Sequence, residues 1–265
     1  MRSLIYYLER WSLTNTSYLI KNILSSALIF MFACYAVKNG VFETYGDTKS
    51  CLFTLLMCAI WSGIFNSIAL FYSEADYTLD DLNKIVTVKV YVIANLLIQI
   101  FVCVVEAVIN ATIFSFFYDY DFNGIFFSNA NFDFVITFIL IMLSADMLGF
   151  ATGMLVSNIT TAMTLIPVLL IIQFLFSGCL FELDKILKPL ARFTTAKWGY
   201  SALGSISRLN DFLLEMNPLA TIDPIFEATR KNLLSCWGNL LILSVVFVFM
   251  AGILLYRKVN YGENN

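Results

Sequence analysis

The sequence has no histidine and few charged residues. Without histidine, the serine and cysteine mechanisms that use an imidazole base are excluded, as are metal sites that use histidine ligands. Charged residues make up 13% of the 265 residues and hydrophobic residues make up 60%. This balance excludes a disordered chain and a soluble enzyme, because too few charges remain to cover a soluble core. The composition therefore predicts a polytopic membrane protein.

Other chemical signatures are missing too. The sequence contains no GxxxxGK[ST] segment, so the chain itself has no P-loop for ATP. Its six cysteines form no CxxC pair, and we expect no metal site. Cys179 and Cys236 flank a long polar segment, and a disulfide between them stays open at this point. The formal net charge is −3 and no basic patch occurs, so nucleic acid is not an expected partner.

Apolar stretches long enough to cross a bilayer recur along the chain. Crossing requires about 20 mostly apolar residues in a helix. The pattern predicts an all-α membrane protein with six transmembrane helices. The third span is long and must tilt, bend or extend beyond the lipid, whereas the fifth is short and contains Pro167, which indicates a kink. The predicted spans are 22–38, 51–72, 88–117, 132–155, 162–178 and 238–256.

The segments outside the spans differ in character. Residues 1–21 place their apolar side chains mainly on one helical face, which predicts a cytoplasmic amphipathic helix at the membrane interface. Residues 22–265 then form one six-span domain. Between spans five and six, residues 179–237 contain three of the four prolines. We expect this segment to form short broken helices that dip into the outer membrane surface.

Basic residues in the short loops predict the orientation. With the N-terminus inside, seven Lys and Arg residues lie on the inner side and two on the outer side. The long segment 179–237 is not counted, because long segments cross largely regardless of charge. We therefore expect both termini in the cytoplasm. An acidic loop at 73–87 and a very short turn at 156–161 then face the inner side.

Two carboxyl groups lie inside predicted spans. Glu106 is about 16 Å from the outer end of span three, near the bilayer midplane. Asp146 lies in the inner half of span four, at a different predicted depth. Charges at such depths are costly, so each group belongs either to a substrate or proton pathway or to an interhelical hydrogen bond. Gln99 and Asn110 fall near the same helix face as Glu106.

Small residues recur at four-residue spacing in two spans. Gly149 and Gly153 form a GxxxG segment in span four, and Gly63 and Ser67 have the same spacing in span two. Such spacing lets two helices approach closely. We favour packing within the chain over a seam between two copies.

Several short segments follow one another in an order typical of one family. They are AIWSGIFNS at 59–67 with the later Glu74, SADMLG at 144–149, SNITTAM at 157–163, LIIQFLFSG at 170–178 and TAKWG at 195–199. Together they resemble the permease domain of G-type ABC exporters, particularly the bacterial group whose ATPase halves carry forkhead-associated domains. The six-span pattern extends this resemblance over the whole chain.

The resemblance implies the transmembrane subunit of an ATP-driven ABC exporter in the plasma membrane. Such a subunit moves an apolar or amphipathic substrate, such as a lipid, a peptide or a drug-like molecule, by alternating access at a seam between two permeases. The resemblance further implies a separate ABC ATPase subunit that holds ATP and magnesium, a second permease as homo- or heterodimer, contact with membrane lipid, and no enzymatic activity in this chain.

By the same resemblance, spans two and five line the seam, and the loop after span two contacts the ATPase. With Glu106 from the analysis of the spans, the predicted substrate-pathway residues are Phe65, Asn66, Glu106, Met163 and Pro167. The predicted ATPase-coupling residues are Glu74, Asp76, Ser157, Asn158 and Thr160.

The coupling loop departs from the family pattern. Family members usually have Glu-Arg followed by a basic Arg-Glu pair, whereas here Ala75 follows Glu74 and the basic residues are missing. This departure leaves open a membrane scaffold that does not transport. A proton-coupled secondary transporter that uses Glu106 is a second alternative.

Overall fold

The computed structural model describes residues 2–37, 40–82, 88–120, 122–156, 158–179 and 187–262, and these residues are almost entirely helical. The long helices are α1 (Arg2–Ala36), α2 (Tyr45–Leu82), α3 (Val88–Phe117), α4 (Ala130–Leu155), α5 (Ile159–Phe176) and α9 (Arg230–Gly262). The short elements between α5 and α9 are α6 (Lys188–Ala191), α7 (Thr195–Ile206), α8 (Leu209–Met216) and the 3₁₀ turn η1 (Pro224–Phe226).

Within the described residues, five helices are long and apolar enough to cross a membrane. Their apolar segments are Leu19–Ala36, Tyr45–Ile68, Lys89–Phe117, Ala130–Leu155 and Arg230–Arg257. These segments confirm the predicted all-α membrane fold and five of its spans. The remaining predicted span, 162–178, coincides with α5, whose apolar stretch Thr160–Phe176 is shorter than the other five.

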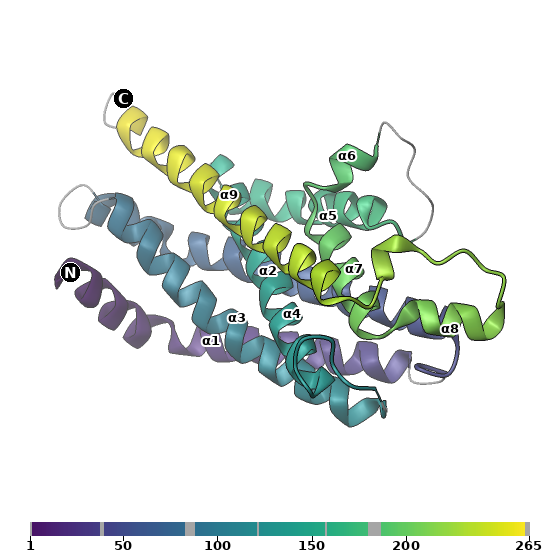
Figure 1. Cartoon of the computed structure of the whole chain (residues 1–265). Helices are drawn as coiled ribbons and strands as arrows, with labels where there is room; N and C mark the ends of the chain where they lie inside the picture. Colours follow the sequence, from purple (N-terminus) through teal and green to yellow (C-terminus); the bar gives the residue numbers. More distant parts are fainter. Residues whose placement is uncertain are drawn as a thin grey trace.

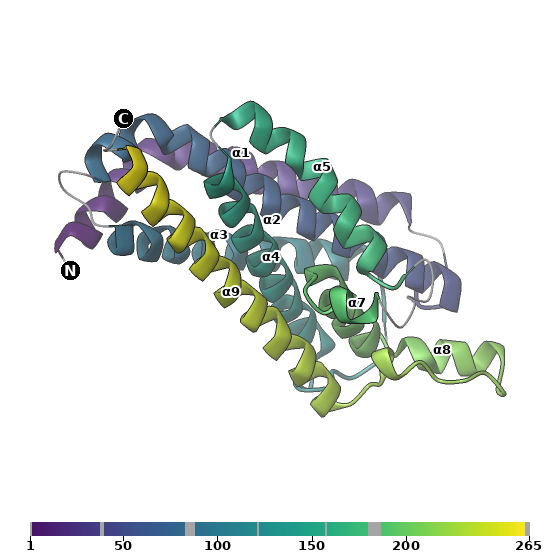
Figure 2. The same ribbon diagram turned by 90° about the horizontal axis from the view of Figure 1, so that it is seen from above.

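The long helices run back and forth between two ends of the bundle. Both termini lie at one end, together with the last turns of α2 and the first turns of α3 (Figure 1). The last turn of α4 and the first turn of α5 lie toward the same end, whereas α3 meets α4 at the opposite end (Figure 2). The predicted grouping of both termini with the 73–87 and 156–161 segments is therefore compatible with the bundle.

Two predicted boundaries do not appear as breaks in the structure. Helix α1 is continuous from Arg2, so no turn separates residues 1–21 from the first apolar span. The predicted loop at 73–87 is wrong for residues 73–82, because α2 continues to Leu82. The segment after Gly63 has no glycine or proline up to Leu82, so charged residues end the apolar span without ending the helix.

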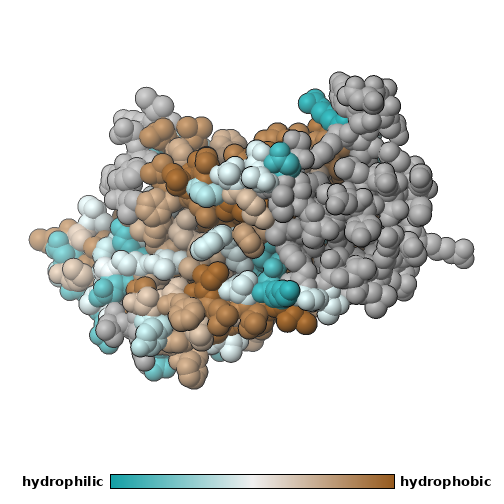
Figure 3. Space-filling model, turned by 180° about the vertical axis from the view of Figure 1, so that it is seen from behind, coloured by the Kyte–Doolittle hydropathy of each residue, from teal (hydrophilic) through white to brown (hydrophobic). Residues whose placement is uncertain are grey.

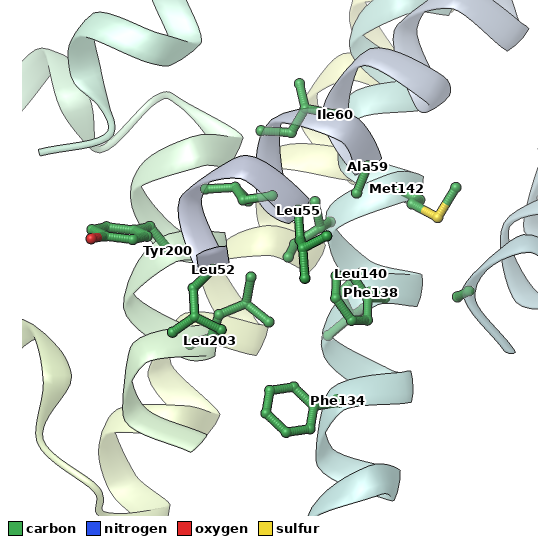
Figure 4. Packing of buried hydrophobic residues seen from close by; sticks show 14 of the residues in the cluster. Leu52, Leu55, Ala59, Ile60, Phe134, Phe138, Leu140, Met142, Tyr200 and Leu203 are labelled. Carbon is green, nitrogen blue, oxygen red and sulfur yellow. The ribbon is translucent and has the colours of Figure 1, made fainter. Parts of the chain in front are cut away.

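Helix α4 lies at the centre of the bundle. It contacts α2, α9 and α3 most extensively, and the buried core in Figure 4 joins its Phe134 and Phe138 to residues of α2 and α7. A Cβ atom at Gly63 would lie 2.7 Å from the Met142 carbonyl oxygen, and one at Gly149 would lie 2.6 Å from the Ile64 carbonyl oxygen. The small-residue segments therefore pack α2 directly on α4 within this chain.

The segment between α5 and α9 folds as short helices, as its prolines predict. Helix α7 packs against α9, α4 and α2, and its Tyr200 ring meets Phe226 of η1 edge to face at 5.2 Å. The disulfide left open in the sequence is not formed, since Cys179 and Cys236 are both free thiols. The Cys236 thiol instead lies 3.4 Å from the Ser201 hydroxyl of α7.

The outward faces of the spanning helices are apolar. Large side chains such as Phe101 on α3, Ile171 on α5 and Phe249 on α9 are exposed. Broad hydrophobic areas also cover the described surface seen from behind, interrupted by small hydrophilic patches (Figure 3). A surface of this kind suits contact with lipid tails, and the chain is an integral, multi-pass membrane protein.

Candidate functional site

The two predicted pathway residues of α2 point in different directions. Phe65 is 39% exposed, whereas its neighbour Asn66 is only 6% exposed. Successive residues of a helix point about 100° apart, so one of a pair can face outward while the other faces the bundle. The structure therefore separates Phe65 from the buried polar groups that surround Asn66.

Glu106 of α3 is held by two donors from α2. The Asn66 side-chain amide donates to Glu106 Oε1 at 2.8 Å, and the Ser62 hydroxyl donates to Oε2 at 3.1 Å. Ser62 and Asn66 are four residues apart, so they lie on one face of α2. Ser26 of α1 also lies beside the carboxyl group.

Asp146 of α4 joins the same region through α3. The Cys103 thiol lies 3.6 Å from Asp146 Oδ2, and Cys103 precedes Glu106 by one helical turn. Near this contact, the Gln99 side-chain amide donates to the Ser67 hydroxyl of α2 at 3.1 Å. We call this set the polar cluster, and its members are Ser62, Asn66, Ser67, Gln99, Cys103, Glu106 and Asp146.

The polar cluster joins three helices in the apolar part of the bundle. Glu106 and Asp146 are each only 1% exposed. None of the hydrogen bonds described for either carboxyl group comes from Lys or Arg. Asp146 Oδ1 is buried without a hydrogen bond in the described part of the chain. An uncompensated charge is costly at such a site, so the cluster can hold a proton or a polar group, and it also ties α2, α3 and α4 together.

Glu106 and Asp146, which the sequence places at different depths of their own spans, belong to one cluster. Cys103 of α3 links the two groups, because it contacts Asp146 and precedes Glu106 by one helical turn. The predicted polar face of α3 is confirmed, because Gln99, Glu106 and Asn110 are all buried.

The predicted pathway residues of α5 lie apart from the hydrogen bonds of this cluster. Met163 is partly buried against the hydrophobic core, whereas Pro167 is exposed. Helix α5 packs against α2, and less extensively against α7 and α4. Gln173 further along α5 accepts a hydrogen bond from the Ala196 backbone amide at 2.9 Å, which anchors α5 to the start of α7.

The predicted coupling residues belong to two separate parts of the chain. Glu74 and Asp76 belong to the final part of α2, and their side chains lie outside the part that the structure describes. Ser157 also lies outside it. Asn158 caps α5, since its side-chain oxygen accepts a hydrogen bond from the Thr161 backbone amide at 2.8 Å, and Thr160 is exposed in the first turn.

The comparison with protein families now decides the class of this chain. The family model described as ABC-2 type transporter matches residues 1–206. The chain belongs to the ABC-2 type transporter family. This family forms the permease domain of ABC transporters, so the chain is a transmembrane component of such a transporter. No curated protein matches the sequence.

Family membership agrees with the missing P-loop, because ABC-2 permease domains are membrane components that lack ATPase motifs. The sequence alone did not reveal Ser62, Ser67 and Cys103 as members of the polar cluster. Their only signal was the small-residue pattern of span two and the position of Cys103 one turn before Glu106. Neither signal says which residues of two different helices meet.

Proposed function

We propose that this ABC-2 permease is the transmembrane subunit of an ATP-driven exporter. In this proposal, a separate ABC ATPase subunit binds ATP and magnesium, and a second permease, identical or different, completes the transporter. Both termini face the cytoplasm of the cell that carries the protein in its plasma membrane. The resemblance to permeases with forkhead-associated ATPase halves supports a partner of that kind.

The observation that carries the proposal is the length of α2. Its apolar run ends at Tyr72, but the helix continues to Leu82. These additional residues extend α2 by about 15 Å, at 1.5 Å per residue. A rigid extension that carries Glu74 and Asp76 toward the end with both termini is suited to contact an ATPase there. The cap of α5 at Asn158 and the exposed Thr160 provide a second contact at the same end.

The packing of the bundle supports a mechanism of alternating access. The polar cluster and the glycine contacts tie α2, α3 and α4, so a push on the end of α2 moves these helices together. Helix α5 is held less extensively and is free to change its position relative to them. Transport then requires that the ATPase contacts differ between two states of the bundle, because coupling is a difference in free energy between states.

The outward apolar surface of α2 and α5 supports an apolar or amphipathic substrate. Trp61 and Phe65 of α2 are exposed, as are Ile171 and Leu175 of α5. With spans two and five at the seam between two permeases, these side chains and the partly buried Met163 line the route. Pro167 removes one backbone hydrogen bond of α5 and allows the helix to bend there.

Affinity purification from native membranes in mild detergent tests the proposal. An ABC ATPase that co-elutes in near-equimolar amount supports the exporter. The same sample shows whether the second permease is a copy of this chain. If no ATPase appears in several detergents or after cross-linking in the membrane, the proposal fails. The altered sequence after Glu74 then favours a membrane scaffold derived from the permease fold.

One observation favours a second candidate, a proton-coupled secondary transporter. Glu106 and Asp146 share a buried cluster without a described Lys or Arg partner, as proton-carrying carboxyl groups do in many transporters. Glu106→Gln retains the size of the side chain and a partner for both Ser62 and Asn66. Transport driven by a proton gradient would be abolished in this variant, whereas ATP-driven transport would continue.

A further inference from the structure

A second site lies where α3 meets α4, at the end of the bundle opposite the termini (Figure 1). A hollow of about 440 Å³ opens there between the last turn of α3 and the first turn of α4. We call it the α3–α4 hollow. Its volume is within the range of small-molecule sites in proteins, roughly 300–1,000 Å³. None of the residues that line the hollow is assigned above to transport or coupling.

Two amides of the hollow are oriented by their other hydrogen bonds. Asn131 Oδ1 accepts hydrogen bonds from the hydroxyl groups of Ser115, at 2.7 Å, and of Tyr120. Asn129 Oδ1 caps α4 by accepting from the Asn131 backbone amide at 2.9 Å. In both residues the oxygen is therefore engaged, and the NH₂ group remains as a donor at the hollow. These two donors are already oriented before a ligand binds, and this lowers the free-energy cost of ordering them on binding.

A hydrogen-bond acceptor and two groups that both donate and accept hydrogen bonds complete the lining. Asp119 contributes an exposed carboxylate, and Asn123 and Ser128 contribute an amide and a hydroxyl group. Within the described residues, no hydrogen bond engages these three side chains. The lining thus offers oriented donors beside a carboxylate that only accepts. This combination is complementary to a ligand with neighbouring hydroxyl groups, because each hydroxyl group both donates and accepts hydrogen bonds.

Aromatic rings form a rigid wall of the same hollow. Tyr120 and Phe122 stack with ring centroids 4.9 Å apart. The Phe42 ring meets both of them at 5.4 Å from the connection between α1 and α2. Phe42 has φ 63°, a conformation that is rare for a bulky residue, and its backbone amide donates to the Thr48 hydroxyl at 2.8 Å. Tyr120 and Phe122 line the hollow, so its aromatic side can pack against the C–H groups of a ring.

The charge of the lining narrows the ligand class. None of the described residues that line the hollow is Lys or Arg, so they offer no cation to pair with a phosphate or carboxylate ligand. Among these described residues Asp119 is the one carboxylate, and it repels anions. No cluster of metal-binding side chains occurs in the described ranges. A neutral ligand with several hydroxyl groups fits the remaining features.

We propose that the α3–α4 hollow binds a neutral saccharide. With both termini in the cytoplasm, the hollow opens on the outer side of the membrane. At that surface the hollow binds sugar rings, and this binding is independent of the proposed substrate route through the bundle. The oriented amides and Asp119 bind hydroxyl groups, and the wall of Tyr120 and Phe122 stacks on the sugar ring.

Saturation-transfer NMR with the full chain in lipid nanodiscs tests this proposal. The probes are methyl β-glucoside, methyl β-galactoside and N-acetylglucosamine, with glucuronic acid as the anionic counterpart of glucose. We expect saturable binding of at least one neutral probe, and at least tenfold weaker binding of glucuronic acid. Absence of saturable binding for all three neutral probes would overturn the proposal.

Two substitutions test whether the hollow is the binding site. Asn131→Asp retains the oxygen that Ser115 and Tyr120 bind but removes the donor, and we expect about tenfold weaker binding of the neutral probe. Asp119→Asn, at an exposed position, should bring the affinity for glucuronic acid closer to that for glucoside. Asn217→Asp is the matched control outside the hollow and should change neither affinity. Binding that is the same in all three variants as in the unmodified chain would contradict the proposal.

Discussion

Helices α4 and α5 follow one another in the chain and are both strongly apolar, yet they take opposite places in the bundle. In α4, 72% of the apolar span is buried inside the protein. In α5, Val168, Ile171, Ile172 and Leu175 are all exposed. Hydrophobicity alone therefore takes a helix into the membrane but does not decide its place there, because lipid tails are as apolar as leucine.

Small residues and polar side chains make the difference between the two helices. Gly149 lets α4 approach α2 until the backbones touch, and Asp146 joins α4 to the polar cluster. Helix α5 contains no glycine, and Pro167 interrupts its backbone hydrogen bonds. The comparison separates a fixed unit of α2, α3 and α4 from a more loosely held α5.

The same substitution in the two helices should have very different effects. Ile141→Ala in α4 removes a completely buried side chain and should destabilise the protein by about 2–4 kcal/mol. Ile171→Ala in α5 should cost less than about 0.5 kcal/mol, because this side chain is 57% exposed. Thermal unfolding of the purified protein in detergent measures both. Equal losses would refute the distinction between the helices.

Replacing glycine by alanine tests how much the close contact between α2 and α4 contributes to stability. Gly149→Ala would place a methyl group 2.6 Å from the Ile64 carbonyl oxygen and should cost about 1–3 kcal/mol. Gly238→Ala in α9 is the matched control, since nothing lies within 4 Å of its added Cβ atom. There the better helix propensity of alanine should leave stability unchanged or raise it by up to about 1 kcal/mol. Similar unfolding temperatures for both variants would contradict direct contact between α2 and α4.

The polar cluster should contribute a smaller, specific amount. Asn66→Leu keeps the side-chain volume but deprives Glu106 Oε1 of its donor, and should destabilise the protein by about 1–2 kcal/mol. Asn239→Leu in α9 is the comparison, because the described hydrogen bond of that amide goes to the Ser235 carbonyl of its own helix. Detergent-induced unfolding should rank the two variants in this order. The reverse order would mean that the cluster does not tie α2 to α3.

The smallest expected difference is between the losses of stability caused by removing the N-cap of α4 and the N-cap of α5. Asn129→Ala removes the cap of α4 and should cost about 1 kcal/mol, because α4 unfolds only with the whole bundle. Asn158→Ala removes the cap of α5 and should cost less than half as much in global stability. Hydrogen exchange should instead rise locally in the first turn of α5. Loss of protection throughout the bundle in Asn158→Ala would show that α5 is not loosely held.

Much of the fold could be predicted from apolar runs. Five spans and the short helices after α5 agree with the pattern, because length and hydrophobicity determine what can cross a bilayer. The end of α2 could not be predicted in this way. The acidic segment after Tyr72 was interpreted as a loop, although a charged segment without glycine or proline can remain helical in water.

The site was only partly predictable. Burial of Glu106 and Asn66 followed from their positions in apolar spans. The contacts of Ser62 with Glu106 and of Cys103 with Asp146 depend on which faces of α2, α3 and α4 pack together, and one sequence does not specify this. The α3–α4 hollow depends on the fold of a short connection and on Phe42 from another connection. No periodic pattern in the sequence indicates that these segments meet.

A crosslinking measurement tests the exporter most directly. A photoreactive amino acid is placed at Asp76 in the extension of α2, at Asn158 before α5, and at Asn217. Asn217 follows α8, the helix at the opposite end of the bundle (Figure 1). After illumination of native membranes, the account predicts an ABC ATPase attached at positions 76 and 158 and absent at 217. Attachment of the ATPase at 217, or at none of the three positions, would contradict it.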